Sequence, residues 1–145
     1  MDDMQINQNN EIMDSLPGMV FEFDTSGRLT YANRQALQIL GYSYDEILTM
    51  NALQFISTEE RERAVRGISR LSKGTEYRSV AYNFVKKDGT TFPVHVYINN
   101  IYKDEHIIGA RGLAVDITAV TMAESLLNQA KNQNDALVRQ TVYTT

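Results

Sequence analysis

Residues that commonly carry enzyme chemistry are scarce in this chain of 145 residues. It has no cysteine, which excludes a thiolate nucleophile, a cysteine-ligated zinc or iron–sulfur site and a cysteinyl-flavin photoadduct. Its only histidines are His95 and His106. We expect His95 on the strand face opposite Val94 and Val96, and His106 in a charged turn. Both are therefore interpreted as exposed or interfacial side chains and not as ligands of a metal or haem.

A carboxylate is the candidate group for acid–base catalysis. Glu22 or Asp24 could act as a general base with a tyrosine as the electrophile, as in a small isomerase. The sequence contains no glycine-rich phosphate loop, no metal-spaced cluster of histidine and aspartate, and no nucleophile elbow to support catalysis. We expect a segment without catalytic activity, and the isomerase-like enzyme is the least favoured interpretation.

The composition describes one ordinary globular domain, with 43% hydrophobic and 22% charged residues. The formal net charge of −4 and the pI near 5.1 argue against a nucleic-acid partner, because the field of the protein repels phosphates. No apolar run approaches the ~18–20 residues of a membrane span, and the start of the chain does not resemble a signal peptide. The sequence thus predicts a cytoplasmic protein without direct membrane insertion.

The period of the apolar residues changes along the first half of the chain. Residues 1–16 have helical spacing, and a two-residue alternation over 19–24 and 28–32 predicts an antiparallel hairpin. A short helix is expected between Asn33 as the N-cap and Gly41 as the C-cap. The Asn33 amide could instead bind the polar group of a ligand, but capping is the favoured interpretation.

Two capping boxes in the middle third predict further helices. The first pairs Ser43 with Glu46. The second pairs Ser57 with Glu60 and opens a longer helix over Thr58 to Ser72. Short helices therefore separate the first hairpin from the strands that follow.

Strand patterns return in the second half. Alternation over 79–84, 92–98 and 107–117 predicts three more strands, and the turn at 86–89 contains the Asp-Gly pair that favours a tight hairpin. The last strand is rich in glycine and alanine, so we expect a ligand or another element to pack closely against it.

The residues after Thr118 predict a helix with a coiled-coil seam. Apolar residues recur at alternating spacings of three and four, with one polar asparagine that can fix the register. We expect this seam either to pair with a second copy of the chain in a homodimer or to dock back on the domain. The seam consists of Val120, Ala123, Leu127, Ala130, Asn134 and Leu137.

Four short motifs, in order and spacing, resemble those of PAS domains from about Leu16 to Thr118. The first is Phe23-Asp24 with Ser26-Gly27-Arg28 and Tyr31-Ala32-Asn33, and the second is Leu40-Gly41-Tyr42-Ser43 with Asp45-Glu46-Ile47. The third is Lys87-Asp88-Gly89 with Phe92-Pro93-Val94, and the fourth is Gly109 with Asp116-Ile117-Thr118. The resemblance implies an α+β fold in which middle helices partly cover a five-stranded antiparallel sheet and enclose a small cavity.

The resemblance also implies a division of the chain. Residues 1–16 would be an N-terminal amphipathic helix, 17–118 the PAS domain, and 119–145 a linker helix that leads to a covalently linked output domain, such as that of a sensor histidine kinase. Asp116, Ile117 and Thr118 would form the signal junction. We expect Thr118 to cap the exiting helix and Asp116 to favour its positive end. We further hypothesise that Asp116 exchanges partners when the sheet shifts.

The sequence does not identify which cofactor or ligand the domain binds. Haem-binding relatives carry their histidine on the long middle helix, and residues 58–72 contain none. A cysteinyl flavin is excluded, whereas a noncovalent flavin, another small apolar ligand or no ligand all remain compatible with the sequence. The expected pocket residues are Phe21, Phe23, Tyr31, Leu37, Leu40, Ile56, Ile68, Tyr82, Phe84, Val96 and Leu113.

The favoured interpretation is a sensory module that binds a ligand or partner and relays the change through its C-terminal helix. The alternative is a ligand-free PAS domain that serves dimerisation or protein interaction.

Overall fold

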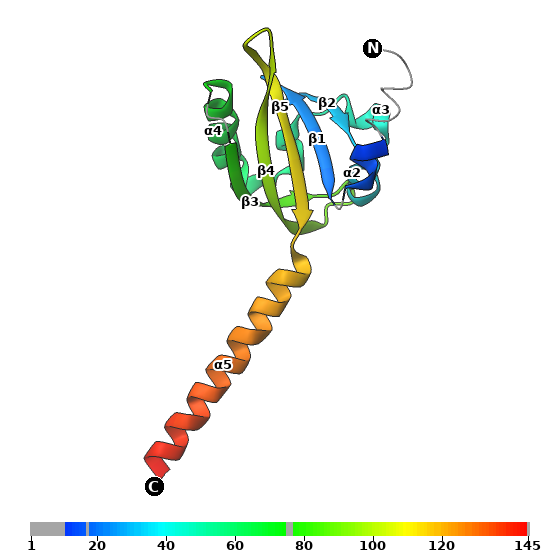
Figure 1. The fold of residues 1–145 in the computed structure, drawn as a ribbon. Helices are drawn as coiled ribbons and strands as arrows, with labels where there is room; N and C mark the ends of the chain where they lie inside the picture. The colour runs from blue at the N-terminus through cyan, green and yellow to red at the C-terminus, as the bar shows by residue number, and fades with distance from the viewer. Residues whose placement is uncertain (1–10, 17, 75–76, 145) are drawn as a thin grey trace.

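The structure is a computed structural model, and it describes residues 11–16, 18–74 and 77–144, with the side chains of 77, 78 and 135–144 excepted. These residues form a five-stranded sheet, a group of short helices and a long C-terminal helix (Figure 1). The strands are β1 (Met19–Asp24), β2 (Leu29–Ala32), β3 (Tyr77–Val85), β4 (Thr91–Lys103) and β5 (His106–Asp116). The helical elements are α2 (Arg34–Leu40), α3 (Tyr44–Ile47), η1 (Ala52–Phe55), η2 (Thr58–Glu60), α4 (Arg61–Ser72) and α5 (Thr118–Thr144).

The sheet has the strand order β2-β1-β5-β4-β3, and every pairing in it is antiparallel. The first and last strands therefore lie side by side, while β2 and β3 are the edges. The segment from α2 to α4 connects these two edges, so it crosses one face of the sheet and covers it (Figure 1). The predicted α+β fold with a five-stranded antiparallel sheet is confirmed.

A single buried amide joins the first elements. The Oδ1 of Asn33 accepts from the backbone N–H of Ala36 and of Val20, at 3.0 Å each. Its Nδ2 donates to the carbonyls of Met13 at 2.9 Å and Gly18 at 3.0 Å. Asn33 is 1% exposed, and protein groups use both ends of its amide. It is thus the predicted N-cap, and its amide has no remaining capacity for a ligand.

The caps of the next two helices are also as predicted. Gly41 ends α2 in the left-handed region, with φ 86°, and its N–H donates to the carbonyl of Leu37. In the capping box of α3, the N–H of Glu46 donates to Ser43 Oγ at 3.1 Å, and the N–H of Ser43 donates to the Glu46 carboxylate at 3.2 Å.

The second predicted capping box is wrong. Ser57 makes no side-chain cap, and Glu60 Oε1 accepts instead from Ser57 Oγ at 2.9 Å and from the N–H of Asn83 on β3 at 2.5 Å. The expected helix over 58–72 is accordingly divided into η2 and α4. Since β3 is an edge strand, its outward N–H groups need partners, and the carboxylate of Glu60 supplies one of them.

Arg63 extends this link between α4 and β3. Its Nη2 lies 2.8 Å from Glu60 Oε2 and donates to the carbonyl of Ala81 at 2.8 Å. Its guanidinium lies 4.4 Å from the ring centroid of Tyr82. Burial by itself would raise the pKa of Glu60, but hydrogen bonds from Asn83, Ser57 and Arg63, with the charge of Arg63, hold the pKa below its ordinary value.

Two glycines of β5 have different surroundings. A Cβ on Gly109 would lie 2.1 Å from the carbonyl oxygen of Phe23, so only glycine lets β1 and β5 approach here. A Cβ on Gly112 would meet the Val96 side chain at 3.7 Å, an ordinary contact. The expected close packing against the last strand is confirmed at Gly109, where the partner is the backbone of β1.

The two ends of the described chain differ in how they contact the sheet. Residues 11–15 are helical and bond to Asn33 through Met13, whereas residues 1–10 of the expected helix over 1–16 lie outside the described residues. At the other end, α5 projects away from the sheet (Figure 1). None of the helices in the described residues combines the length and apolar character of a membrane span.

The Asn33→Ala substitution should be far more destabilising than the loss of an ordinary cap. It leaves two backbone N–H groups and two carbonyls without their buried partner, so we expect a loss of about 3 kcal/mol or more in the free energy of unfolding. The exposed cap variant Ser43→Ala is the control, with an expected loss of about 1 kcal/mol. Urea denaturation compares them, and equal losses would contradict a central role for Asn33.

Glu60 should make stability depend on pH. Because its pKa is lowered in the folded state, its contribution is present above the ordinary pKa of glutamate and is lost as the pH falls through the folded value. Glu60→Gln should therefore cost about 1–2 kcal/mol near neutral pH and little at about pH 3. The measurement is denaturation across this range, with the exposed neighbour variant Glu59→Gln as the control. The same pH profile for both variants would refute this role.

Candidate functional site

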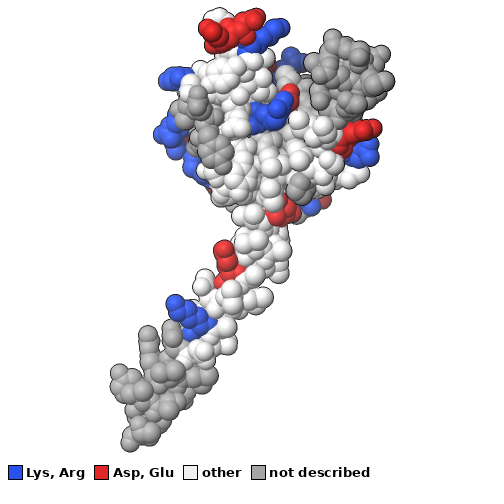
Figure 2. Space-filling model, in the orientation of Figure 1, with Lys and Arg blue, Asp and Glu red and all other residues white. Residues whose placement is uncertain are grey.

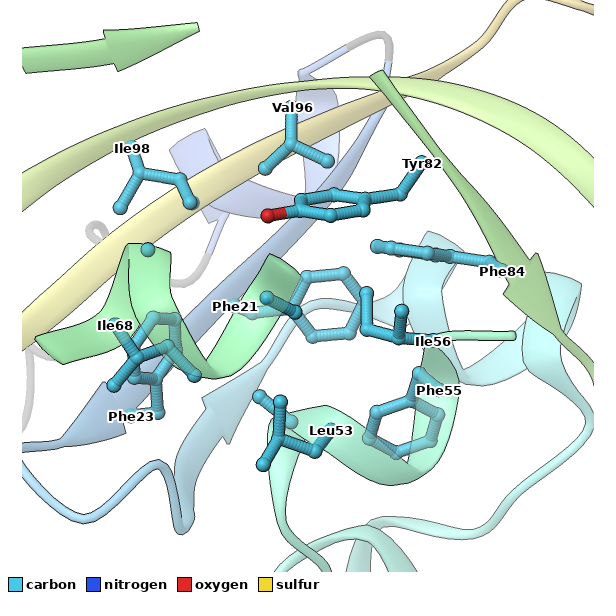
Figure 3. A pocket seen from close by; sticks show the side chains of 14 residues that line it. Phe21, Phe23, Leu53, Phe55, Ile56, Ile68, Tyr82, Phe84, Val96 and Ile98 are labelled. Atoms are coloured by element: carbon cyan, nitrogen blue, oxygen red, sulfur yellow. The ribbon is translucent and has the colours of Figure 1, made fainter. Parts of the chain in front are cut away.

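A cavity of about 60 Å³ lies between the inner face of the sheet and the elements η1 and α4. Side chains from β1, β3 and β4, with Gly112 of β5, form its sheet side, and Figure 3 shows the aromatic and aliphatic groups that surround it. Its wall is almost wholly apolar, and Tyr82 is the only one of the described lining residues with a polar side-chain group. The lining residues are Phe21, Phe23, Ala52, Leu53, Phe55, Ile56, Ala64, Gly67, Ile68, Tyr82, Phe84, Val96, Ile98 and Gly112.

Packed aromatic rings hold part of this wall in place. The ring of Phe21 stacks on Phe55 with centroids 6.2 Å apart and meets the edge of Phe84 at 6.1 Å. Phe55 and Phe84 in turn contact Tyr42 at 5.6 Å and Phe92 at 6.2 Å. Such offset and edge-to-face contacts fix ring orientations, so the cavity is a preformed space.

Seven of the expected pocket residues line this cavity, namely Phe21, Phe23, Ile56, Ile68, Tyr82, Phe84 and Val96. The other four do not. Leu40 is fully buried in the core and Leu37 is packed against its edge. Tyr31 pairs with Glu22 and Leu113 pairs with Val20 and Tyr97. Since directly paired residues share a face, Tyr31 and Leu113 lie on the outer face of the sheet.

Seven lining residues were not expected from the sequence, and two reasons account for five of them. Leu53 and Phe55 lie on the one-turn helix η1, which is too short to show a period. Ala64, Gly67 and Gly112 are small and leave space instead of filling it. Ile98 was on the predicted alternating face of its strand, so that pattern could have identified it. Ala52 had no such signal.

The two carboxylates of the isomerase interpretation do not reach the cavity. Asp24 Oδ1 accepts from the hydroxyl and N–H of Ser26 at 2.6 and 2.9 Å and from the N–H of Arg28 at 3.1 Å. The hydrogen bond from the Ser26 hydroxyl is the main cause of the lowered pKa of Asp24, which weakens it as a base. Glu22 pairs with Arg111, at 2.8 Å from its Nε and 2.5 Å from its Nη2.

The histidines also lie away from the cavity. His95, half-buried on β4, has a hydrogen bond to the hydroxyl of Ser79, and the centroid of its ring lies 4.8 Å from that of Tyr97. His106 is exposed at the start of β5. In the part of the chain that the structure describes, no three histidine or acidic side chains are grouped so that they could hold a metal ion.

The expected signal junction connects β5 to α5. Asp116 Oδ1 accepts from the N–H of Thr118 at 2.8 Å and from its hydroxyl at 2.5 Å. The N–H of Ile117 donates to the carbonyl of Pro93 on β4 at 3.0 Å. Asp116 therefore accepts from the first N–H of α5, and the Thr118 hydroxyl donates to it as well. This differs from the expectation that Thr118 itself caps the helix.

The expected dimer seam on α5 is exposed in this single chain. Val120 and Leu127 are 55% and 69% exposed, and Ala123, Ala130 and Asn134 are exposed as well. The side chain of Leu137 lies outside the described residues. The described seam residues do not dock back on the domain, which was one of the two expected arrangements.

The sequence of residues 17–119 matches the PAS domain family. Sporulation kinase C of Bacillus subtilis (strain 168) is 30% identical to the chain over 135 residues, which is 92% of the chain and 30% of the kinase. The chain thus spans about 30% of the length of this relative.

Two solved structures show the same fold. A PAS domain from Colwellia psychrerythraea has a TM-score of 0.72 at 17% identity, covering 79% of this chain and 98% of that chain. The PAS domain of an HTR-like protein from Haloarcula marismortui has a TM-score of 0.69 at 20% identity, covering 79% and 93%. The chain belongs to the PAS domain family, as a sensory module related to a sporulation kinase.

Proposed function

We propose that the chain is the sensory segment of a larger signalling protein, in which occupancy of the cavity reorients α5. The observation that carries this proposal is that β4 and β5 both line the cavity and both bond to the start of α5. Val96 lies in the cavity wall three residues after Pro93, which accepts the Ile117 N–H, and Gly112 lies in the wall four residues before Asp116. A shift of either strand therefore moves a group that holds the helix.

The register of the sheet extends this link to the edge strand. Tyr82 in the cavity wall pairs with Val94, and Val94 pairs with Asp116. Asn83, bonded to Glu60, pairs with Pro93. Two adjacent rows of paired residues thus run across the sheet from β3 to the signal junction. One passes through Tyr82 and Val94, and the other through Asn83 and Pro93.

A homodimer is the second part of the proposal. A helix with an exposed apolar seam favours pairing with a second copy, since Val120 and Leu127 would otherwise stay in water. The outer face of the sheet provides a further surface with few charges (Figure 2), where Tyr97 is 41% exposed beside half-buried Leu113 and Val115. The homologous kinase is much longer than this chain, which supports a covalently linked output domain. We also propose that the chain is located in the cytoplasm.

The alternative function, a ligand-free dimerisation module, is favoured by the size of the cavity. About 60 Å³ is well below the ~150 Å³ of an engineered cavity that binds benzene. Packing defects of this scale occur in domains without a ligand, so the experiment has to detect occupancy directly.

The first experiment compares the purified chain with its Gly112→Ala variant by native and denaturing mass spectrometry. The added methyl fits beside Val96 and takes space from the cavity. We expect a homodimer carrying a small extra mass that is lost on denaturation, and a reduced fraction of that mass in the variant. Thr30→Val, an exposed change on β2, is the control and should keep the wild-type spectrum. A bare homodimer in all three would favour the ligand-free module, and a monomer would contradict the dimer.

The second experiment tests the relay with a spin label on α5. The chain has no cysteine, so Ser125→Cys, exposed and outside the seam, provides a unique label. We expect Gly112→Ala to change the label-to-label distance distribution in the dimer and Asp116→Ala to abolish that change, with a stability loss of about 0.5–2 kcal/mol. Asp88→Ala removes a similar local bond to Thr90 and is the control. If Asp116→Ala lowers stability but the distances still respond to Gly112→Ala, Asp116 has only a structural role at the start of α5.

A further inference from the structure

Tyr82, a buried residue, brings into the cavity a hydroxyl that has no partner among the described residues. The residue is 6% exposed, and its ring contacts the guanidinium of Arg63. Among the described residues, the hydroxyl has no hydrogen-bond partner. Figure 3 shows the ring extending from β3 among the lining side chains, with its oxygen at the inner end. A tyrosine as deeply buried as this one usually has a hydrogen bond to its hydroxyl, so the unpaired hydroxyl indicates a missing partner.

Water is a poor candidate for that partner. A buried water is typically held by two to four polar groups, and the side chains of this wall offer one. The apolar side chains around the hydroxyl cannot replace the other hydrogen bonds that a water molecule would lose on entering the cavity. A molecule that carries its own apolar body can satisfy the hydroxyl and the wall together.

Charge and size restrict the molecule further. Among the side chains that the structure describes, none that is cationic or anionic lines the cavity, and Arg63 contacts the ring of Tyr82 without being a lining residue. A carboxylate, such as the head of a fatty acid, would therefore lose its hydration without a counter-ion. A flavin has several polar edge groups for which the lining side chains offer a single partner. The volume of about 60 Å³ also favours a molecule of few heavy atoms.

We propose that the cavity takes a small, uncharged, largely apolar molecule with one hydrogen-bond acceptor, and that Tyr82 donates to this acceptor. The inference rests on the proposed function, since it names the ligand class of the same cavity. Arg63 is a positioning residue in this site, because its contact with the ring, together with its bonds to Glu60 and Ala81, holds Tyr82 in place.

The test uses a matched pair of probes, cyclopentanone and methylenecyclopentane, which have nearly the same shape but differ in the acceptor oxygen. Methyl NMR titrations give the affinity of each probe for the wild-type chain and for Tyr82→Phe, which keeps the ring. We expect the ratio of ketone to hydrocarbon affinity to fall about two- to twelvefold in Tyr82→Phe, the effect of one hydrogen bond. Tyr97→Phe removes an exposed hydroxyl and should keep the wild-type ratio.

Each other outcome would overturn a distinct part. An unchanged affinity ratio in Tyr82→Phe, with both probes bound at the cavity methyls, would refute the acceptor and leave the cavity as an apolar site. Binding of butyrate to the same methyls would refute the uncharged class. If neither probe shifts the methyls of Val96, Ile98 and Ile68, the cavity is not a ligand site, and that part of the proposed function fails as well.

Discussion

The buried carboxamide of Asn33 is the interaction on which the arrangement of the first half of the fold depends. Its oxygen accepts from the N–H of Val20, as a neighbouring strand would, and from the N–H of Ala36, which caps α2. Its nitrogen donates to the carbonyls of Met13 and Gly18. An amide suits this place because it offers two acceptor sites and two donors on opposite ends of one rigid plane. A carboxylate would repel both carbonyls, and a hydroxyl is too short to reach four groups. One side chain thus fixes the start of β1, the start of α2 and the preceding helical segment.

The cavity arises from the distribution of side-chain size across the sheet. β1, β3 and β4 place phenylalanine, tyrosine and branched residues on the inner face, whereas β5 between β1 and β4 places Ala110, Gly112 and Ala114 there. Large residues on β5 would fill the space under α4. The small residues of this strand therefore serve two purposes, because Gly109 permits the approach of β1 while Gly112 leaves room in the cavity.

Local signals in the sequence predicted most of the fold, and the errors arose where contacts between distant residues decide the structure. The caps at Asn33 and Ser43 could be predicted because their partners are three residues away. Glu60 could not, because its competing partner Asn83 is 23 residues away and becomes available only once β3 forms a sheet edge. Strand alternation likewise identified cavity residues on β1, β3 and β4. It did not find those on η1. Leu113 and Tyr31 were wrongly expected in the cavity, because their place on the outer face follows from the register, which a single strand does not reveal.

The two ends of the domain differ in the strength of their attachment, and this difference fits a relay that leaves through α5. The N-terminal side is held by a buried amide, which is costly to break. The junction is held by an exposed carboxylate, a cap of about 0.5–2 kcal/mol, and by one backbone bond to Pro93. A ligand can shift an equilibrium only by its differential affinity, and a molecule of a few heavy atoms has at most ~1.5 kcal/mol per atom to contribute. Under the proposed relay, the Asp116 junction would move at a lower cost than the Asn33 centre, so the response of the domain would be confined to the end that leads to α5.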